Sequence, residues 1–156
     1  MTTYRNGEIS HWARVTERPA LRTGATLPDE VDLVVVGAGL TGLWLAYYAL
    51  VDDPSTRVVV LEAERVGYGA SGRNGGWLSP LLPGNRAVYA RTSGIDAVRS
   101  FQREMLGAID ETLDVVAREG IAADAVRGGQ LRVATTRAGL ARLEAERAGH
   151  LRFGYD

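Results

Sequence analysis

Two short runs of valine and leucine, separated by a longer apolar segment, form the clearest pattern in the chain. The first run covers Leu33–Val36 and leads directly into Gly37, after which an uncharged Ala- and Leu-rich segment follows. The second run covers Arg57–Leu61, and Pro54 interrupts the chain before it. Short continuous apolar runs are typical of strands buried on both faces, and the longer segment is typical of a helix. The sequence therefore predicts a strand–helix–strand unit of the α/β class, with its helix over residues 40–51.

Further elements are predicted in the second half of the chain. Residues 78–91 contain two prolines and are expected to form a loop. Residues 92–119 are expected to form an amphipathic helix with Ser93 at its cap, because apolar residues recur every three or four positions. These apolar positions are Val98, Phe101, Met105, Ile109, Leu113 and Val116. Alternating polarity predicts a half-exposed strand over Gln130–Thr135, and Thr136 is expected to cap a short final helix.

The first 30 residues show no sustained periodicity, and prolines and a glycine interrupt them. We expect residues 1–30 to form an extended arm that lies on the domain. His11 and Trp12 are the bulky ring pair of this arm, and an aromatic anchor is favoured over a catalytic histidine because no titratable partner lies nearby in the sequence. The predicted organisation is an arm over residues 1–30, an α/β region over 31–91, and a further region over 92–156 that begins with the long helix.

The turn after the first predicted strand has the glycine spacing G-x-G-x-x-G, over Gly37, Gly39 and Gly42. The first glycine allows a sharp turn where a Cβ atom would clash, and the second allows the backbone to approach a pyrophosphate. The third glycine allows the helix to pack closely on the strand. The free N–H groups and the dipole at the start of the helix favour an anion. This pattern predicts a dinucleotide-binding turn.

An acidic residue at the end of the second strand strengthens this prediction. Glu62 lies 20 residues after Gly42 and directly follows the second valine run. A carboxylate at this place can accept hydrogen bonds from both ribose hydroxyls of an adenosine, and it would repel the 2′-phosphate of NADP. The competing interpretation of Leu33–Val51 as a membrane span is disfavoured by its three glycines, by the adjacent Asp32 and by the second strand that soon follows.

A second glycine-rich stretch, Glu62–Trp77, contains glycines at positions 67, 69, 72, 75 and 76 together with Ser71, Arg73 and Asn74. So many permissive backbone positions beside hydrogen-bonding side chains favour a second cradle for a large ligand. A flexible surface loop is the alternative.

Composition narrows the classes of function. Of the 156 residues, 46% are apolar, so the chain can bury a core, and its net charge of −1 does not favour nucleic acid or an anionic membrane as a partner. The absence of cysteine excludes disulfides, thiolate metal sites, a cysteine nucleophile and a cysteinyl link to a cofactor. No apolar signal segment is visible near Met1, and a cytoplasmic location is the default expectation.

Three segments together resemble the amino-terminal part of a known enzyme family. They are Val-Val-Gly-Ala-Gly-Leu-Thr-Gly, Val-Leu-Glu-Ala-Glu-Arg-Val-Gly and Gly-Ala-Ser-Gly-Arg-Asn-Gly-Gly. The chain resembles the FAD-dependent oxidoreductases of the D-amino-acid oxidase-like group, which includes sarcosine, glycine and γ-glutamylputrescine oxidases. The likeness is strong over residues 32–77 and looser beyond, and the Ser-Gly-Arg-Asn-Gly-Gly segment separates this group from NAD dehydrogenases.

The resemblance implies two sets of FAD-binding residues. The first set would meet the pyrophosphate and comprises Gly37, Gly39, Leu40 and Thr41, with Gly42 packing the helix. The second set would contact the pyrophosphate and ribityl chain and comprises Ser71, Arg73 and Asn74. Between them, Glu62 would hold the adenosine ribose and Arg65 would lie near the adenine or ribose. Gly75 and Gly76 would pass close to the isoalloxazine ring.

The resemblance also implies a Rossmann-like FAD-binding region with a βαβ unit over residues 31–91, and a helix with the incomplete start of a substrate-binding domain over residues 92–156. It implies a chemistry as well. Hydride would pass from the substrate carbon that bears nitrogen to the flavin, and the resulting imine would hydrolyse. Some relatives attach the flavin through histidine or cysteine in the second stretch, which contains neither here, so non-covalent FAD is expected. No residue of this chain is assigned as a catalytic acid or base, and no metal site is expected.

Family members are typically more than twice this length, so we expect a truncated chain that is inactive alone. A complementing carboxy-terminal chain is a possible partner, besides an amine or amino-acid substrate in the whole enzyme. The valine-rich first strand expects neighbours on both sides, so poor solubility or marginal stability is predicted for the chain alone. Two rival functions remain open, namely an NAD-dependent dehydrogenase fragment and a non-catalytic nucleotide-binding remnant.

Overall fold

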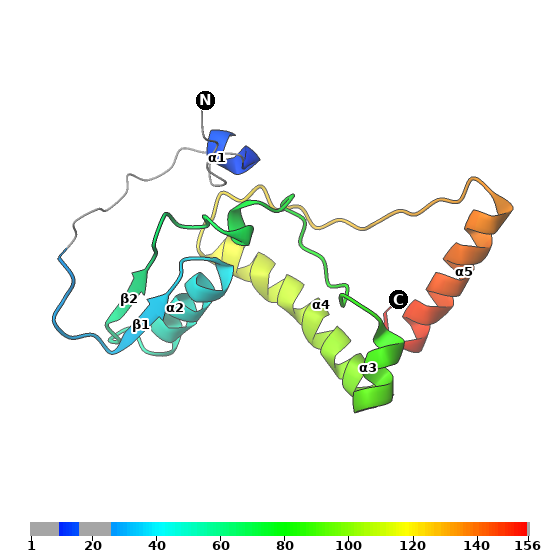
Figure 1. The fold of residues 1–156 in the computed structure, drawn as a ribbon, viewed down its shortest axis with the longest axis horizontal. Coiled ribbons are helices and arrows are strands. Elements are labelled where there is room, and N and C mark those ends of the chain that lie inside the picture. The colour runs from blue at the N-terminus through cyan, green and yellow to red at the C-terminus, as the bar shows by residue number, and fades with distance from the viewer. Residues whose placement is uncertain (1–9, 16–25, 156) are drawn as a thin grey trace, which may run out of the picture. The chain divides into compact units, whose positions relative to one another are not determined.

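The computed structural model describes residues 10–15 and 26–155, apart from the side chains of Ala13 and Arg14. The chain divides into two compact units, residues 1–77 and residues 78–156, and each unit is described by itself. Figure 1 labels their elements. The division falls inside the region 31–91 that the sequence groups together, and the predicted domain limits stay a prediction.

The amino-terminal arm contains a short helix, α1, over His11–Val15. The expectation of a wholly extended arm is therefore wrong for this segment. Residues 1–9 and 16–25 of the predicted arm lie outside the described residues.

The first unit is built on two parallel strands, β1 (Leu33–Val36) and β2 (Val58–Leu61), which pair from Leu33 with Val58 to Val36 with Leu61. The helix α2 (Leu40–Asp52) connects them and lies beside the sheet in Figure 1. The predicted strand–helix–strand order is confirmed, with element limits within one or two residues of those expected. It follows that the turn after β1 and the residue after β2 lie at the same edge of the sheet.

An ion pair fixes the opposite ends of the two strands. The guanidinium of Arg57 donates two hydrogen bonds to Asp32, at 3.0 and 2.9 Å, and the Arg57 backbone N–H donates a third at 2.8 Å. These bonds hold the pKa of Asp32 at about 2, below its ordinary value of 3.8. The pairing stabilises the register in which β1 and β2 begin together.

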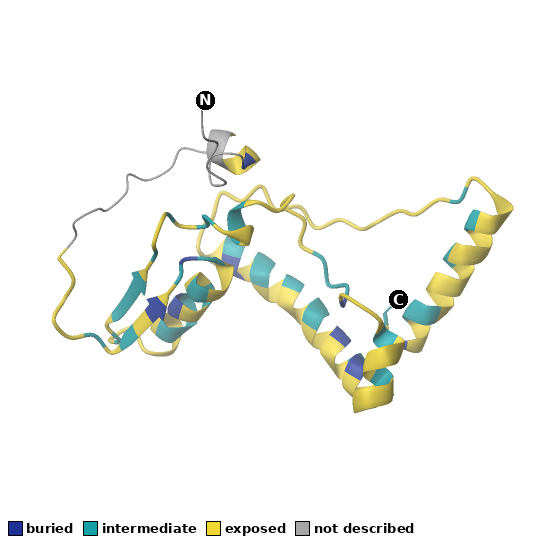
Figure 2. Cartoon of the chain, viewed as in Figure 1, coloured by how far each residue is buried: buried dark blue, intermediate teal, exposed yellow. Residues whose placement is uncertain are grey.

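The core of the first unit is small and lies between the sheet and α2. Val35, Ala38 and Ala46 are buried there. Alternate side chains of β1 point to the other face, where Val34 is 49% exposed and Val36 is 84% exposed. Among the described residues the sheet has only these two strands. One face of β1 is therefore apolar and exposed in the described part of the chain. Figure 2 colours each described residue by its burial.

The second unit contains three helices, α3 (Arg86–Ser93), α4 (Ile95–Arg118) and α5 (Arg137–Arg152). The expectation of a loop over residues 78–91 is wrong in its second half, because α3 begins there. The Asn85 side chain caps α3 by accepting hydrogen bonds from two backbone N–H groups of its first turn.

The start of the long helix also differs from the expectation. Ser93 is the last residue of α3 and does not cap α4. Gly94, with φ of 84°, turns the chain between the two helices, so α4 begins at Ile95 rather than at Thr92. At the other end, Gly120 follows α4 with φ of 61°, which confirms the predicted termination.

The strand predicted over Gln130–Thr135 is absent from the structure. Leu131 and Val133 are 88% and 75% exposed, and no neighbouring strand pairs with this segment in the described part of the chain. A strand needs such a partner for its backbone groups. The Thr136 side chain accepts a hydrogen bond from the Gly139 N–H at 3.0 Å, which confirms the predicted cap of α5.

The second unit buries a compact apolar cluster made of Leu82, Val98 and Phe153. Beside it, Gln102 is fully buried, and its amide donates to the Pro80 carbonyl at 2.8 Å. No helix within the described ranges is both long and apolar enough to cross a membrane.

Candidate functional site

The first bend, residues 37–42, turns the chain from β1 into α2 and is tightly closed. Gly37 has φ of 101°, a conformation that side-chain-bearing residues rarely adopt. A Cβ atom on Gly42 would lie 2.1 Å from the Gly37 carbonyl oxygen, so only glycine fits there. Gly37 turns the chain as predicted, through its positive φ, but the expected Cβ clash is wrong, because a Cβ atom there would meet nothing within 4 Å. The packing role predicted for Gly42 is confirmed, because its Cβ atom would also lie 3.1 Å from the Val35 side chain.

The second bend, residues 67–76, repeats the geometry of the first. Its beginning, Gly67–Gly72, has the same G-x-G-x-x-G spacing as the first bend. This repeat was not among the predictions made from the sequence. Gly67 has φ of 70°, and a Cβ atom on Gly72 would lie 2.2 Å from the Gly67 carbonyl oxygen. The bend leads into a single 3₁₀ turn, η2 (Ala70–Gly72). The spacing itself was the signal that could have revealed this second closed turn.

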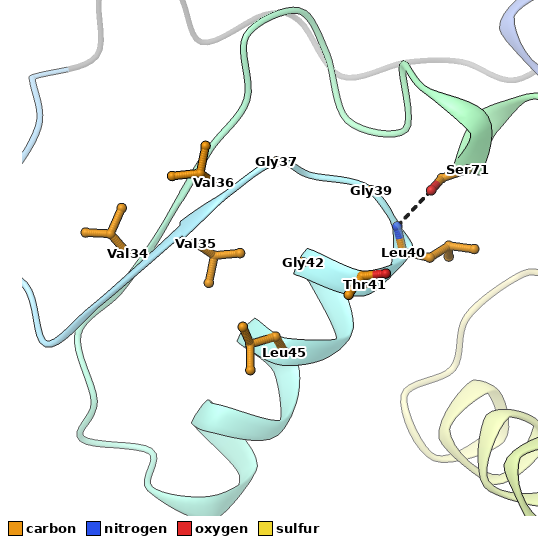
Figure 3. A pocket seen from close by; sticks show the side chains of 10 residues that line it. All are labelled: Val34, Val35, Val36, Gly37, Gly39, Leu40, Thr41, Gly42, Leu45 and Ser71. Atoms are coloured by element: carbon orange, nitrogen blue, oxygen red, sulfur yellow. Dashed lines mark hydrogen bonds between the residues drawn. The ribbon is translucent and has the colours of Figure 1, made fainter. Parts of the chain in front are cut away.

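Two direct hydrogen bonds join the bends. The Gly67 N–H donates to the Ala38 carbonyl at 2.9 Å. The Leu40 N–H donates to the Ser71 hydroxyl at 3.0 Å, as Figure 3 shows. Helix α2 has no side-chain cap of its own at Gly39, so Ser71 supplies that cap from a distant part of the sequence. The two bends therefore form one connected surface within the first unit.

Glu62 lies at the mouth of the first bend, where the sequence predicted it. Its carboxylate accepts hydrogen bonds from the Ala38 N–H at 2.8 Å and from the Glu64 N–H at 3.1 Å. These backbone bonds, that of Ala38 first, lower the pKa of Glu62 below its ordinary 4.5, so the carboxylate is ionised at neutral pH. The backbone of Ala63 also contributes to this lowering of the pKa. An ionised carboxylate has about four acceptor positions, so acceptor capacity remains for a hydroxyl donor of a ligand.

The polar side chains of the second bend have unequal freedom. Arg73 donates from Nε to the Tyr68 carbonyl at 3.1 Å and lies over the Tyr68 ring, with its Cζ 5.3 Å from the ring centroid. Its two Nη groups take no part in that bond and stay available for an anion. By contrast, Asn74 braces the bend with both ends of its amide, through the Ser71 carbonyl and the Gly76 N–H, each at 2.8 Å.

A hollow of about 380 Å³ lies along β1 and the start of α2. Figure 3 shows its lining, which consists of Val34, Val35, Val36, Gly37, Gly39, Leu40, Thr41, Gly42, Leu45 and Ser71. All the residues predicted at the first bend, together with Ser71, line this hollow. Glu62, Arg65, Arg73, Asn74, Gly75 and Gly76 lie outside its lining. The Arg65 carbonyl accepts a hydrogen bond from the Tyr68 N–H at 3.0 Å, which closes a turn.

The helix start is the polar part of this hollow. The first N–H with a partner inside α2 is that of Leu43, which donates to Gly39 at 3.0 Å. Because Ser71 takes the N–H of Leu40, those of Thr41 and Gly42 have no acceptor within the helix. Together with the helix dipole, they make this end favourable for a phosphate.

Comparison with known proteins shows the family of the chain and, with it, the cofactor. The model of the family described as FAD dependent oxidoreductase matches residues 32–156, which include both bends and the whole second unit. The chain belongs to the FAD-dependent oxidoreductase family. FAD is therefore its cofactor, and the prediction made from the three sequence segments is confirmed.

Two curated relatives support membership of the FAD-dependent oxidoreductase family. The chain is 37% identical over 123 residues to the γ-glutamylputrescine oxidoreductase of Escherichia coli, an alignment that covers 79% of this chain and 28% of that protein. It is 30% identical over 127 residues to the probable oxidoreductase OrdL of Haemophilus influenzae, covering 81% of this chain and 29% of that protein. The chain thus spans less than a third of the length of these relatives. No solved structure matches it significantly.

Proposed function

We propose that the two bends and Glu62 bind FAD without a covalent bond, as the Rossmann-like nucleotide-binding part of an oxidoreductase that oxidises a C–N bond. The observation that carries the proposal is the pair of hydrogen bonds between the bends, with Glu62 bonded to the same turn. Residues from two glycine-rich segments are thereby held around one helix start.

The residues present fit FAD. The N–H groups of Thr41 and Gly42 and the Nη groups of Arg73 are donors suited to the pyrophosphate. The remaining acceptor positions of Glu62 suit the ribose hydroxyls of the adenosine. We assign Gly39 to the close approach of the pyrophosphate, Arg65 to the neighbourhood of the adenosine, and Gly75 and Gly76 to that of the flavin ring.

The hydroxyl of Ser71 has a double role in this proposal. It accepts from Leu40 and keeps its own proton, so it can donate to a phosphate oxygen while still capping α2. Asn74 contributes mainly by holding the bend in shape, although its second amide hydrogen remains for the ribityl chain.

When bound, FAD supplies the acceptor for the hydride that leaves the substrate carbon next to nitrogen. The chain's own residues bind the cofactor and orient it, and none of them is assigned a proton-transfer role. An amine is the proposed substrate class, which is supported by the printed name of the relative from Escherichia coli. A cytoplasmic location remains part of the proposal.

The experiment is an equilibrium titration of the purified, folded chain with FAD, followed by visible absorption and by quenching of flavin fluorescence. We expect saturable binding of FAD, with NAD as the competing ligand failing to displace it. The absorption of bound flavin should be lost after acid precipitation of the protein, because the bond is not covalent. Preferential binding of NAD, or no binding of either nucleotide, would overturn the proposal.

A non-catalytic nucleotide-binding remnant is the second candidate, and the same two bends would serve it. Adding a candidate complementing carboxy-terminal chain separates the two functions. Peroxide release from amines, or reduction of an artificial electron acceptor, should appear only in the mixture if the chain is part of an oxidoreductase.

A further inference from the structure

The short helix α1 and the residue before it contact the second bend, although they lie 62 residues earlier in the sequence. The Ser10 hydroxyl donates to the Gly72 carbonyl. The indole Nε1 of Trp12 donates to the Asn74 carbonyl at 2.8 Å. We call Ser10 and Trp12 the strap.

The indole ring of Trp12 also packs against the bend. A Cβ atom built on Gly76 would lie 3.2 Å from its Cζ2 atom and 3.6 Å from its Cη2 atom. The Trp12 ring thus covers Gly76, while its indole N–H donates to the carbonyl of Asn74, two residues before Gly76. Ser10 is buried, at 9% exposure, so its hydrogen bond is partly shielded from competing water, whereas Trp12 is 37% exposed and its hydrogen bond is open to solvent.

The strap determines where the N–H groups of the bend point. In a trans peptide the carbonyl and the N–H point in opposite directions, and the described chain contains no cis peptide bond. Holding the Gly72 carbonyl turns the Arg73 N–H inward, where it donates to Ala70 at 3.1 Å. Holding the Asn74 carbonyl turns the Gly75 N–H away from α1, and no acceptor in the described part of the chain meets it.

One further hydrogen bond spans this peptide. The Asn74 side-chain oxygen accepts from the Gly76 N–H at 2.8 Å, which closes a local turn around the Asn74–Gly75 peptide. A Cβ atom on Gly75 would meet no described atom within 4 Å, so close packing does not hold the peptide. The indole of Trp12 adds a contact from outside the bend, at the Asn74 carbonyl oxygen itself.

We propose that Ser10 and Trp12 are positioning residues: Trp12 holds the Asn74–Gly75 peptide so that the Gly75 N–H is presented to an electronegative edge of the flavin ring, and Ser10 supports it by holding the nearby Gly72–Arg73 peptide. The inference rests on the proposed function, because it needs FAD in the site formed by the two bends. It adds that the amino-terminal arm takes part in shaping that site.

The test uses three variants of the 156-residue chain. Trp12→Phe keeps an aromatic ring and removes the indole donor, and Ser10→Ala removes the hydroxyl donor. Trp77→Phe is the matched control, since that indole is 72% exposed and adjoins the same bend. Each variant is titrated with FAD, its bound flavin spectrum is recorded, and the free protein is digested briefly with trypsin. Cleavage after Arg73 measures how open the second bend is without any cofactor.

We expect Trp12→Phe to weaken FAD binding about five-fold, the effect of losing one neutral hydrogen bond. Cleavage after Arg73 should accelerate, cleavage in the second unit should not, and the visible bands of bound flavin should shift. Ser10→Ala should show the same changes, more weakly, and Trp77→Phe should show none of them.

The failures of the two proposals are distinguishable. A wild-type chain that takes up no FAD overturns the proposed function, and with it the flavin part of this inference. Normal uptake by the wild type with unchanged affinity and spectrum in Trp12→Phe overturns the inference alone. The inference is also overturned if cleavage rises equally at all sites, or if Trp77→Phe behaves like Trp12→Phe.

Discussion

The first and second bends share a spacing and a closed geometry, yet they lead to different structures. Each begins with a glycine at positive φ. In each, the third glycine of the G-x-G-x-x-G spacing lies against the carbonyl oxygen of the first. The first leads into the 13-residue helix α2, and the second leads into a 3₁₀ turn of three residues. The G-x-G-x-x-G spacing therefore specifies a close turn and does not by itself specify the helix.

The residues after each turn explain the difference. Leu, Ala, Trp and Tyr residues come after the first bend, and they favour a helix that packs Ala46 against β1. The second bend continues into Arg73, Asn74, Gly75 and Gly76, and two consecutive glycines oppose a helix. The first bend is stabilised by the element it starts. The second depends on side chains, namely Ser10 and Trp12 from an earlier part of the sequence and its own Asn74.

The largest effect is expected from Gly42→Ala. The added Cβ atom would meet the Gly37 carbonyl oxygen at 2.1 Å, and backbone cannot yield as a flexible side chain can. We expect a loss of about 3 kcal/mol in the free energy of unfolding, measured by denaturant titration. Gly107→Ala in α4 is the control, because nothing lies near its added Cβ atom and helix propensity should stabilise it by about 1 kcal/mol.

The equivalent substitution in the second bend, Gly72→Ala, tests whether the two bends contribute differently to stability. Its steric conflict is similar, at 2.2 Å from the Gly67 carbonyl oxygen, but the turn it distorts supports little of the core. The loss of FAD affinity should therefore exceed the loss of stability. Equal destabilisation by Gly42→Ala and Gly72→Ala would contradict the view that the first bend alone supports the fold.

Glu62→Ala comes next, because it removes the carboxylate at the mouth of the first bend. FAD affinity should fall about ten-fold, since hydrogen bonds to a charged acceptor are lost. Isothermal calorimetry provides the measurement. Glu64→Ala removes a nearby exposed carboxylate and should leave the affinity unchanged.

Ser71→Ala breaks the bond through which the second bend caps α2. The expected loss of stability is about 1 kcal/mol, typical of a lost N-terminal cap, and amide exchange at Leu40 should accelerate. Ser100→Ala on the exposed surface of α4 should change neither quantity. If Leu40 exchanges at the wild-type rate in Ser71→Ala, the bends are not coupled through this hydroxyl.

The smallest effect is expected for the free energy of unfolding when the pH is lowered into the acid range. Because Arg57 lowers the folded pKa of Asp32 from 3.8 to about 2, the stabilisation is complete above pH 3.8 and is lost as the pH falls toward 2. Unfolding free energy measured between pH 5 and 2 should fall less steeply in Asp32→Asn than in the wild type. Parallel pH profiles would show that this pair contributes nothing to the register of the strands.

The elements around the first bend were predictable because their signals are local. Valine runs, glycine spacing and Pro54 placed β1, α2 and β2 correctly, and Thr136 marked the start of α5. The strand over Gln130–Thr135 failed because alternation shows compatibility with a sheet without supplying a partner strand. The helix α3 was missed because Pro80 and Pro83 drew the predicted loop too far, although Asn85 is a good cap.

The site was predictable in its residue types and only partly in its contacts. Spacing placed Glu62 at the first bend, because parallel strands end at the same edge. The Ser71 cap and the strap join residues 31 and 62 positions apart, and no local pattern encodes such pairings. Their hydrogen bonds are visible only once the chain is folded.

The distance in sequence between the strap and its partner imposes an order on biosynthesis. Residue 12 leaves the ribosome well before residue 74, and the chain grows by only about 5–20 residues per second. For several seconds the indole of Trp12 has no carbonyl to bind, while β1, α2 and β2 emerge and can pair. The second bend is thus completed by an earlier part of the nascent chain that folds back onto a later one.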